Sequence, residues 1–372
     1  MALRYLLPGQ MRFMKANGFD VLMISADGKE LKEVIENENC RHIIVPMTRK
    51  ITPFRDLKCL FQLIRIFRKE RPDIVHTHTP KAGLLGMLAA RFCGIKIRIH
   101  TVAGLPLMVE KGIRFRLLKF IERLTAASAN HVWPNSNSLM HYIIDYRLAN
   151  PRKLQVIGKG STNGIDTHQF SRNDLDEKTI QDIKSAISYS AENRYLLFIG
   201  RLVADKGIIE LVNVFTSLQQ QYPDLKLIVV GGYENTLDPL PEKTVLEIGS
   251  NSSITHINWT DEVKYYLFLA GYFIFPSHRE GFPNVLLQAG AMELPVICSR
   301  IEGNVDLIIP DSTGLLFDRG SEQQMKEAIE KALSGPQTMK TMAKRLRELI
   351  CSDYQQENTW QNMLEAYKSL LH

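Results

Sequence analysis

The chain has 372 residues, with 46 Lys and Arg against 40 Asp and Glu and a formal net charge of +6. It is longer than the roughly 250–300 residues at which a single hydrophobic core stops growing, so we expect two domains. Hydrophobic residues at 45% and charged residues at 23% are ordinary for a soluble globular protein, which excludes a disordered chain and a fibre.

The charge and the cysteines narrow the class of protein further. A net charge of +6 is too small to indicate a nucleic-acid partner, although it suits acidic ligands or an anionic membrane surface. The five cysteines form no CxxC pair, which argues against a zinc cage or a disulfide framework. The longest apolar run, Tyr265 to Pro276, is shorter than the roughly 20 residues of a membrane-spanning helix. We expect a cytoplasmic protein, with peripheral attachment to the inner face of the plasma membrane as an alternative.

Short apolar runs alternate with longer amphipathic runs along the first half, as in parallel sheets built from βαβ units. The predicted strands are Asp20 to Ser25, His42 to Pro46, Asp73 to His78, Ile95 to Val102, His131 to Pro134 and Leu154 to Ile157. The predicted helices are Leu57 to Lys69, Lys81 to Phe92, Ile113 to Ala127 and Asn137 to Tyr146. The segment Leu3 to Lys15 already has a helical pattern, so we expect the opening strand and its glycine turn to be missing.

The alternation restarts after a polar stretch, Asn163 to Asn193, which we expect to connect two domains. The predicted strands are Tyr195 to Ile199, Lys226 to Val230, Ile254 to Asn258, Tyr272 to Phe275, Val296 to Ser299 and Gly314 to Leu316. The predicted helices are Gly207 to Gln221, Glu262 to Ala270, Asn284 to Glu293, Glu322 to Leu333, Met339 to Cys351 and Gln356 to Leu371. We place the domains at residues 1–165 and 166–354, with a helix at 355–372 that packs back on the first domain.

The most informative segment is 277–290, SHREGFPNVLLQAG, which lies between a predicted strand and a predicted helix. Pro283 suits the first turn of that helix, whose free backbone N–H groups and positive dipole end favour a phosphate. Glu280 would repel a phosphate but would accept hydrogen bonds from sugar hydroxyl groups attached to it. The segment therefore predicts a site for a phosphorylated sugar.

A second segment, 198–207 with the sequence FIGRLVADKG, also runs from a strand through a loop to a helix. It brings Arg201 and Lys206 to the carboxyl end of the strand, the edge at which ligands of open α/β sheets bind. A guanidinium fork and an ammonium group there would neutralise a departing diphosphate without a metal ion.

These two segments together resemble the retaining GT-B glycosyltransferases of family four. The likeness also includes DIVHTHTPKAGLLG at residues 73–86, NGID at 163–166, and Phe170. It implies an α/β protein of two Rossmann-like domains whose parallel sheets face each other across a cleft. It further implies transfer with retention of anomeric configuration, with the acceptor in the first domain and the nucleotide sugar in the second.

In that family the residues matching Arg201 and Lys206 bind the donor diphosphate, and the residue matching Glu280 contacts the donor sugar. Glu280 opens an E-x7-E motif whose second Glu is Gln288 here, so the ribose contact would lose its charge. The full set of donor-binding residues implied by the resemblance is Gly200, Arg201, Lys206, Gly231, Glu280, Gly281, Phe282, Pro283, Asn284, Val285 and Gln288.

The first domain departs from the family pattern at a histidine. Many relatives carry a His directly before a Gly near the transferred sugar, whereas Ala103 precedes Gly104 here. His100 and His78 are the candidates to take part of its place and complete the catalytic set. His76 and His78 alternate on one strand face and would suit a metal, but no third ligand accompanies them. We expect no metal and no cofactor, since the nucleotide sugar is a substrate.

Each of these residues also has a purely structural interpretation. Taken alone, the side chains of Arg201 and Lys206 would be solvated charges on a loop. Glu280 would be a helix cap, and Gln288 would be an exposed residue of a helix. The basic and apolar stretches Lys111 to Arg123 and Leu57 to Arg71 would ordinarily just pack on a sheet. A basic face there would also suit anionic lipid.

The resemblance favours a hexosyltransferase-type enzyme that moves a sugar, most simply from a uridine-diphosphate donor, to a sugar or polyprenyl-linked acceptor. Synthesis of surface polysaccharide, such as capsule or lipopolysaccharide, is the corresponding process. Two alternatives stay open at this point: a sugar-nucleotide epimerase on the same frame, and a sugar-nucleotide binder without catalytic activity.

Overall fold

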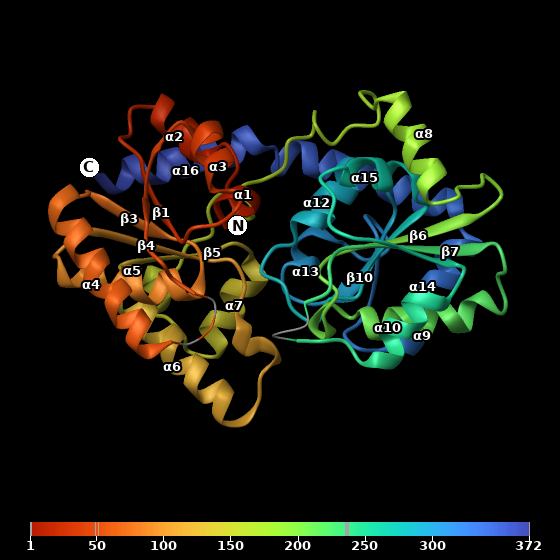
Figure 1. The fold of residues 1–372 in the computed structure, drawn as a ribbon, viewed down its shortest axis with the longest axis horizontal. Helices are drawn as coiled ribbons and strands as arrows, with labels where there is room; N and C mark the ends of the chain where they lie inside the picture. The colour runs from red at the N-terminus through yellow and green to blue at the C-terminus, as the bar shows by residue number, and fades with distance from the viewer. Residues whose placement is uncertain (1, 49, 51, 235–237, 372) are drawn as a thin grey trace. The chain divides into compact units, whose positions relative to one another are not determined.

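The computed structural model describes the chain except residues 1, 49, 51, 235–237 and 372 (Figure 1). The chain divides into two compact units. Unit 1 comprises Met1–Gly164 and Gln356–His372, and unit 2 comprises Ile165–Gln355. The two boundaries of unit 2 each lie one residue from the domain boundaries expected from the sequence. The C-terminal helix belongs to unit 1.

The described strands of unit 1 form two parallel sheets. In one sheet β1 (Leu22–Ser25) pairs with β2 (Arg41–Ile44), and in the other the order is β3 (Ile74–Thr77), β4 (Ile97–Val102) and β5 (His131–Pro134). The predicted strand Leu154 to Ile157 is wrong. A 3₁₀ turn, η2 (Pro151–Lys153), directly precedes it, and Leu154 forms only an isolated bridge with Val132.

Three helices of unit 1 pack side by side: α5 (Pro80–Phe92) contacts β3 and β4 and lies between α4 (Pro53–Glu70) and α6 (Gly112–Ser128). Figure 1 shows them on the side of the strands away from α2 (Gln10–Ala16) and α16 (Gln356–Leu371). The other helices are α1 (Ala2–Leu6), α3 (Leu31–Glu38) and α7 (Asn137–Asp145), with the 3₁₀ turn η1 (Pro106–Val109).

Two helical predictions for unit 1 need correction. The single helix expected at Leu3 to Lys15 is divided into α1 and α2, because Pro8 and Gly9 interrupt it and Gly9 has φ 80°. The helix α3 was not predicted, since it is short and has few apolar residues, but Val34 is buried in it.

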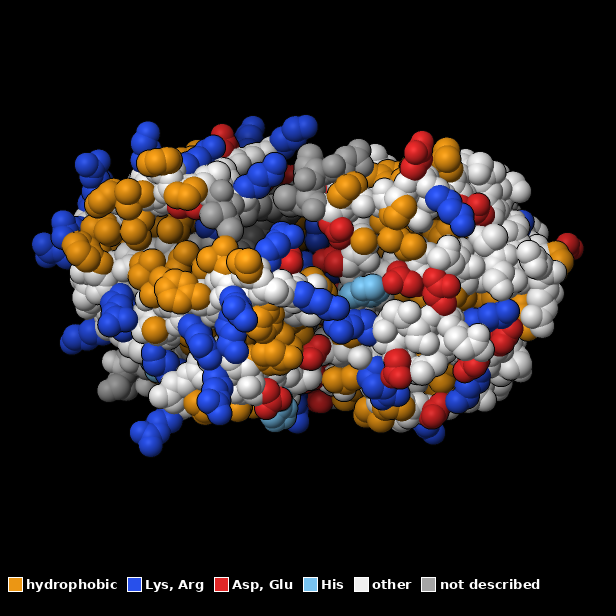
Figure 2. All heavy atoms as spheres, turned by 90° about the horizontal axis from the view of Figure 1, so that it is seen from below, with side chains coloured by type: hydrophobic (Ala, Val, Ile, Leu, Met, Phe, Trp, Pro, Cys, Tyr) orange, Lys and Arg blue, Asp and Glu red, His pale blue; other side chains and the backbone are white. Residues whose placement is uncertain are grey.

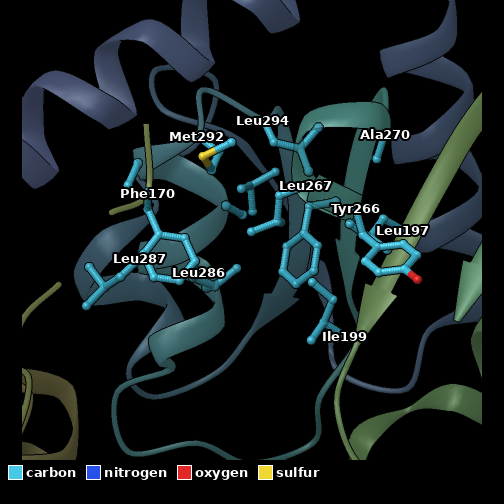
Figure 3. Close-up of a cluster of buried hydrophobic side chains, with 14 of the residues drawn as sticks. Phe170, Leu197, Ile199, Tyr266, Leu267, Ala270, Leu286, Leu287, Met292 and Leu294 are labelled. Carbon is cyan, nitrogen blue, oxygen red and sulfur yellow. The ribbon is translucent and has the colours of Figure 1, made fainter. Parts of the chain in front are cut away.

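Unit 2 contains one parallel sheet of six strands in the order β11-β10-β9-β6-β7-β8. The strands are β6 (Arg194–Ile199), β7 (Leu225–Val230), β8 (Ile254–Ile257), β9 (Tyr272–Phe275), β10 (Val296–Arg300) and β11 (Leu315–Asp318). Successive side chains of β6 point to opposite faces, so Leu197 packs into one core and Phe198 into another. Figure 3 shows the first of these cores, to which Leu197, Ile199, Tyr266 and Leu286 all belong.

Helices cover both faces of this sheet. They are α8 (Glu177–Ala186), α9 (Ile208–Gln219), α10 (Glu242–Ser250), α11 (Val263–Leu269), α12 (Asn284–Ala291), α13 (Asn304–Leu307), α14 (Glu322–Ser334) and α15 (Pro336–Asp353). The helix α8 corrects the expectation of a plain polar connection. The Asp176 side chain accepts a hydrogen bond from Thr179 N and caps α8, and Ile180 and Ile183 are buried in the core of unit 2.

None of the described helices combines the length and apolar character needed to cross a lipid bilayer.

Candidate active site

The site begins where β6 ends, and close backbone approach requires glycine there. Gly231 follows β7 with φ 148°, and a Cβ at this position would lie 1.8 Å from the carbonyl oxygen of Gly200. Gly200 N in turn donates to Val230 O at 2.9 Å. Only a residue without a side chain fits between these two loops. The contact fixes the path of the backbone that carries Arg201.

A second close approach joins the loop after β6 to the loop after β9. Gly207 has φ 69° and directly precedes α9, and a Cβ there would lie 2.1 Å from the carbonyl oxygen of Pro276. The preceding 3₁₀ turn, η3 (Ala204–Lys206), therefore lies against the segment that carries Glu280. His278 N donates to Asp205 O at 2.9 Å and ties the two loops together.

Lys206 and Glu280 form an ion pair in this arrangement. Their side chains are only 17% and 15% exposed, so the pair is largely shielded from water. The Ser277 hydroxyl donates to Glu280 Oε1 at 2.9 Å and holds the carboxylate in place. The structure thus joins one cation of the first motif to the carboxylate of the second.

Arg201 does not share that pair. Its guanidinium forms an ion pair with Glu234, which follows β7, and its side chain is 44% exposed. Since β6 lies between β9 and β7, the loop after β6 reaches a carboxylate on each side. Arg201, Lys206 and Glu280 lie along the carboxyl edge of one sheet, although only Lys206 and Glu280 contact each other.

One further ion pair and one histidine–carboxylate contact cross-link these loops, and sequence reasoning missed both. Arg279 Nη2 lies 2.7 Å from Asp205 Oδ2, and His278 Nε2 lies 2.9 Å from Glu210 Oε1. Burial raises the pKa of Glu210, but hydrogen bonds from His278 and from backbone outweigh it, and the pKa falls below its usual value. All four residues lie in or beside the two motifs. Their pairing across about seventy residues has no signal in one sequence.

The helix α12 follows Glu280 and begins at Asn284. The preceding Pro283 has no polar side chain, so the N-cap residue itself offers no side-chain acceptor to the first turn of α12. Gly281, Phe282 and Pro283 are buried, whereas the remaining predicted donor-binding residues of this helix are half-buried: Asn284, Val285 and Gln288. Gln288 lies one turn into α12, as the motif spacing predicts.

His100, predicted as part of the catalytic set, lies inside unit 1. It is 3% exposed, its Nδ1 is 2.9 Å from the Thr77 hydroxyl, and a Cβ on Gly83 of α5 would lie 2.4 Å from its ring. Burial lowers the pKa of His100 to about 4, although a hydrogen bond with Thr77 opposes this, so the ring is neutral at pH 7. This position beneath α5 favours a structural role.

His78 lies on the opposite face of the sheet, after the end of β3. Its ring centroid is 4.0 Å from that of His76, and its Nδ1 is buried without a hydrogen-bond partner. Burial, with His100 nearby, lowers the pKa of His78 to about 3 and keeps it neutral. His76 is held by Tyr367 and Thr101, so it has no free nitrogen for a metal. Ala103 and Gly104 lie in the loop after β4.

Comparison with known proteins matches each unit to a glycosyltransferase family. The family described as Glycosyl transferases group 1 matches residues 180–349, and the Glycosyl transferase 4-like domain matches residues 8–160. The capsular polysaccharide biosynthesis glycosyltransferase CapM of Staphylococcus aureus is 34% identical over 367 residues, covering 98% of this chain and 94% of CapM. The chain belongs to the group 1 glycosyl transferases.

A more distant relative of this glycosyltransferase is the UDP-Gal:alpha-D-GlcNAc-diphosphoundecaprenol alpha-1,3-galactosyltransferase of Escherichia coli. It is 24% identical over 343 residues, which cover 90% of this chain and 85% of the relative. Among solved structures, Anabaena HepE in complex with UDP and glucose superposes with a TM-score of 0.79. It is 16% identical, and the match covers 96% of this chain and 94% of HepE. The glycosyltransferase therefore has the GT-B fold, with two α/β units built on parallel sheets.

The described residues contain no group of three or more His, Cys, Asp or Glu side chains placed to hold a metal ion. Metal independence stays a prediction, as do the roles of the individual donor-binding residues.

Proposed function

We propose that this glycosyltransferase moves a sugar from a uridine-diphosphate sugar to a polyprenyl-diphosphate-linked sugar, with retention of anomeric configuration, during surface polysaccharide synthesis. The observation that carries the proposal is the shielded Lys206–Glu280 pair at the carboxyl edge of the unit 2 sheet, with Arg201 on the same loop as Lys206. A cation and a hydroxyl acceptor side by side match a ligand that carries phosphate next to sugar.

Lys206 and Arg201 would bind the diphosphate of the donor. Each now pairs with a carboxylate, so diphosphate binding would transfer the two cations from Glu280 and Glu234 to phosphate. The positive dipole end at the start of α12 would further favour the phosphate. Together they stabilise negative charge that grows on the leaving diphosphate.

Glu280 would then accept hydrogen bonds from hydroxyl groups of the donor sugar. Ser277 holds one of its oxygens, and the Asp205–Arg279 pair anchors the backbone on both sides of the site. Gln288 would hold the ribose diol through neutral hydrogen bonds. In the transfer, the anomeric carbon exchanges its bond to the β-phosphate oxygen for a bond to the acceptor oxygen. The acceptor hydroxyl proton leaves with the diphosphate or with solvent.

The choice of donor and acceptor is supported by related proteins. HepE is described in complex with UDP, and the E. coli relative is named for UDP-Gal and a diphosphoundecaprenol-linked sugar. The name of CapM supports a place in surface polysaccharide synthesis. In unit 1, His78 remains our candidate for contact with the acceptor, because it is neutral and has a nitrogen without a partner.

The test combines purified protein with a panel of UDP-sugars, with and without a short polyprenyl-diphosphate sugar. We expect a glycosylated lipid only when both substrates are present, and NMR of the product should show the anomeric configuration of the donor. A new UDP-sugar formed without acceptor would indicate an epimerase. Binding of the donor without product from any acceptor would indicate a non-catalytic binder, and an inverted anomer would refute retention.

A further inference from the structure

Three polar residues of unit 2 form a hydrogen-bonded network inside the protein, beneath the turn that carries Glu280. Figure 2 shows charged side chains of both signs on the surface of unit 2, at the right. Ser277, Ser299 and Asn304 instead are 0% exposed, and no other described polar residue of unit 2 is buried so completely. Burying a polar side chain costs free energy unless it is hydrogen-bonded, so apolar residues would serve better at positions that only fill the core.

The network lies where two neighbouring strands end. Phe275 of β9 lies opposite Cys298 of β10, so Ser277 and Ser299 come just past this part of the register. The Ser299 hydroxyl donates to the backbone carbonyl of Ser277. The Asn304 amide, at the start of α13, donates to Ser299 O at 2.9 Å and lies 3.4 Å from Ser299 Oγ. The network therefore links the ends of two strands to the start of a helix.

A glycine allows the start of α13 to approach the Glu280 turn. Gly303 has φ 81°, and a Cβ there would lie 2.3 Å from the carbonyl oxygen of Gly281. Gly281 directly follows Glu280 in the chain, and Gly303 directly precedes Asn304. Only a residue without a side chain fits at this contact. The turn that carries Glu280 is therefore in contact with the segment that carries Asn304.

The orientation of the Asn304 amide follows from its contact with Ser299. With its nitrogen toward Ser299 O the amide forms a hydrogen bond, whereas the opposite orientation would place two carbonyl oxygens 2.9 Å apart. The amide oxygen of Asn304 is then buried without a hydrogen-bond partner. An unpaired buried acceptor lowers stability, so the contact with Ser299 explains this residue better than packing does.

The Ser277 hydroxyl has one hydrogen and three acceptors within reach. Glu280 Oε1 is the nearest at 2.9 Å, and the carbonyl oxygens of Arg279 and Asp205 lie at 3.2 Å and 3.5 Å. Since the three distances are similar, a small shift of the Ser277 backbone would redirect the hydroxyl. The hydrogen bond from Ser299 to the Ser277 carbonyl opposes such a shift.

Donor binding makes this hydroxyl more important. In the structure, the Glu280 carboxylate contacts both Lys206 and Ser277. Under the proposed function, Lys206 turns to the donor diphosphate. Of the contacts that described side chains make with Glu280, the Ser277 hydroxyl would then remain. The residues that fix Ser277 would therefore determine where the carboxylate lies when the sugar is bound.

We propose that Ser299 and Asn304 are positioning residues for sugar transfer. They fix the Ser277 backbone so that its hydroxyl holds Glu280 in place for the donor sugar. Neither residue touches the donor, since both are fully buried. The proposal rests on the proposed function and extends it to two residues that lie outside both sequence motifs.

The test is calorimetric titration of the full chain with UDP and with the UDP-sugar that binds tightest in a panel. Ser299→Ala removes the hydroxyl that fixes Ser277. One lost hydrogen bond should weaken binding of the UDP-sugar on the order of fivefold. UDP has no sugar for Glu280 to contact, so its affinity should stay at the wild-type value. In the transfer assay the same variant should lose kcat on the order of tenfold.

Two controls separate positioning from a general loosening of the fold. Glu280→Ala removes the group that the network holds, so adding Ser299→Ala to it should not weaken UDP-sugar binding further. Ser253→Ala removes another buried hydroxyl, in a residue that is 4% exposed and accepts from Lys226 Nζ at 2.9 Å. Ser253 directly precedes β8, at the opposite edge of the parallel sheet, so its variant should bind both ligands like the wild-type protein.

Asn304→Ala tests the second residue of the network. It should weaken UDP-sugar binding and leave UDP binding unchanged, as Ser299→Ala does. Because both residues act through Ser277, the double variant Ser299→Ala/Asn304→Ala should lose less than the product of the two single effects. Either single variant decides the proposal if the other does not fold.

Several outcomes would overturn the proposal. One is equal weakening of UDP and UDP-sugar binding in Ser299→Ala, which would indicate a general disturbance of the site. Another is an undiminished effect of Ser299→Ala when Glu280 is already alanine. Wild-type kcat and UDP-sugar affinity in the network variants, with transfer by the wild-type protein intact, would count against the positioning role only. A wild-type protein that binds neither ligand would refute the proposed function and this proposal with it.

Discussion

Replacement of Lys206 by alanine should have two separable effects, one on stability and one on ligand binding. The Lys206 and Glu280 side chains are 17% and 15% exposed, so Lys206→Ala leaves a shielded carboxylate without its cation. Breaking a fully buried pair costs about 3–5 kcal/mol. Because this pair lies at a loop edge that water reaches, we expect about 2 kcal/mol. In a unit the size of 165–355 this corresponds to a fall in Tm of roughly 4–8 °C.

The second effect is on nucleoside diphosphate affinity. A hydrogen bond to a charged group contributes about 1.5–3 kcal/mol, so Lys206→Ala should weaken UDP binding on the order of 10- to 100-fold. Calorimetric titration with UDP and thermal unfolding without ligand measure the two effects independently. The matched control is Lys340→Ala, which removes an exposed cation of unit 2 far along the chain and should change neither.

The double variant Lys206→Ala/Glu280→Gln distinguishes the two roles. The neutral amide removes the unpaired charge, so the double variant should recover most of the lost Tm. UDP affinity should stay low, because the cation that would bind the diphosphate is still absent. If the double variant recovered both the Tm and the UDP affinity of the wild-type protein, the Lys206 ammonium would matter only as a partner for Glu280. If Lys206→Ala bound UDP as tightly as the wild-type protein, the proposed diphosphate contact would be refuted.

Three further predictions concern the backbone, a buried acid and a positioning pair. Gly231→Ala should lower the Tm severely or prevent folding, because the added Cβ would lie 1.8 Å from a carbonyl oxygen. The control is Gly249→Ala in α10, whose added Cβ meets nothing within 4 Å, so this variant should be neutral or stabilising by up to about 1 kcal/mol. An equal effect of the two would contradict the close approach. Burial raises the pKa of Glu122 from 4.5 to about 7. The neutral Glu122 carboxyl is therefore fully compatible with folding below pH 4.5, and the free energy of unfolding should fall by on the order of 3 kcal/mol as the pH rises through 7. Glu122→Gln should therefore unfold with the wild-type protein in acid but at a higher temperature at about pH 8, and a constant difference across pH would refute this. Arg279→Ala removes the ion-pair partner of Asp205, which lies at 2.7 Å, and should lower kcat more than it weakens UDP binding. An unchanged kcat would show that the Arg279–Asp205 pair does not position the site.

The buried parallel strands were the most predictable part of the fold. Tyr195 to Ile199 and Tyr272 to Phe275 are apolar on both faces, since helices cover both sides of the sheet, and they match β6 and β9 within one residue. Leu154 to Ile157 has a similar composition, but a preceding proline turn leaves it only one bridge. The helix α8 was hidden because its two buried isoleucines are surrounded by polar residues.

The site was predictable as positions and not as contacts. The two motifs placed Lys206 and Glu280 at strand ends, and β6 lies beside β9 in the sheet, so their meeting follows from topology. The partner of Arg201 was not predictable, because Glu234 follows a different strand and carries no motif. The environment of His100 was not predictable either, because its packing under Gly83 depends on the fold and not on the neighbouring motif.

The most direct test of the account is a crystal structure of the protein with UDP. It should show the β-phosphate within hydrogen-bond distance of Lys206 Nζ and of the Arg201 guanidinium, with Glu280 free of phosphate contact and turned toward the position of the sugar. UDP bound elsewhere, or bound at this edge with the Lys206–Glu280 and Arg201–Glu234 pairs both intact, would contradict it.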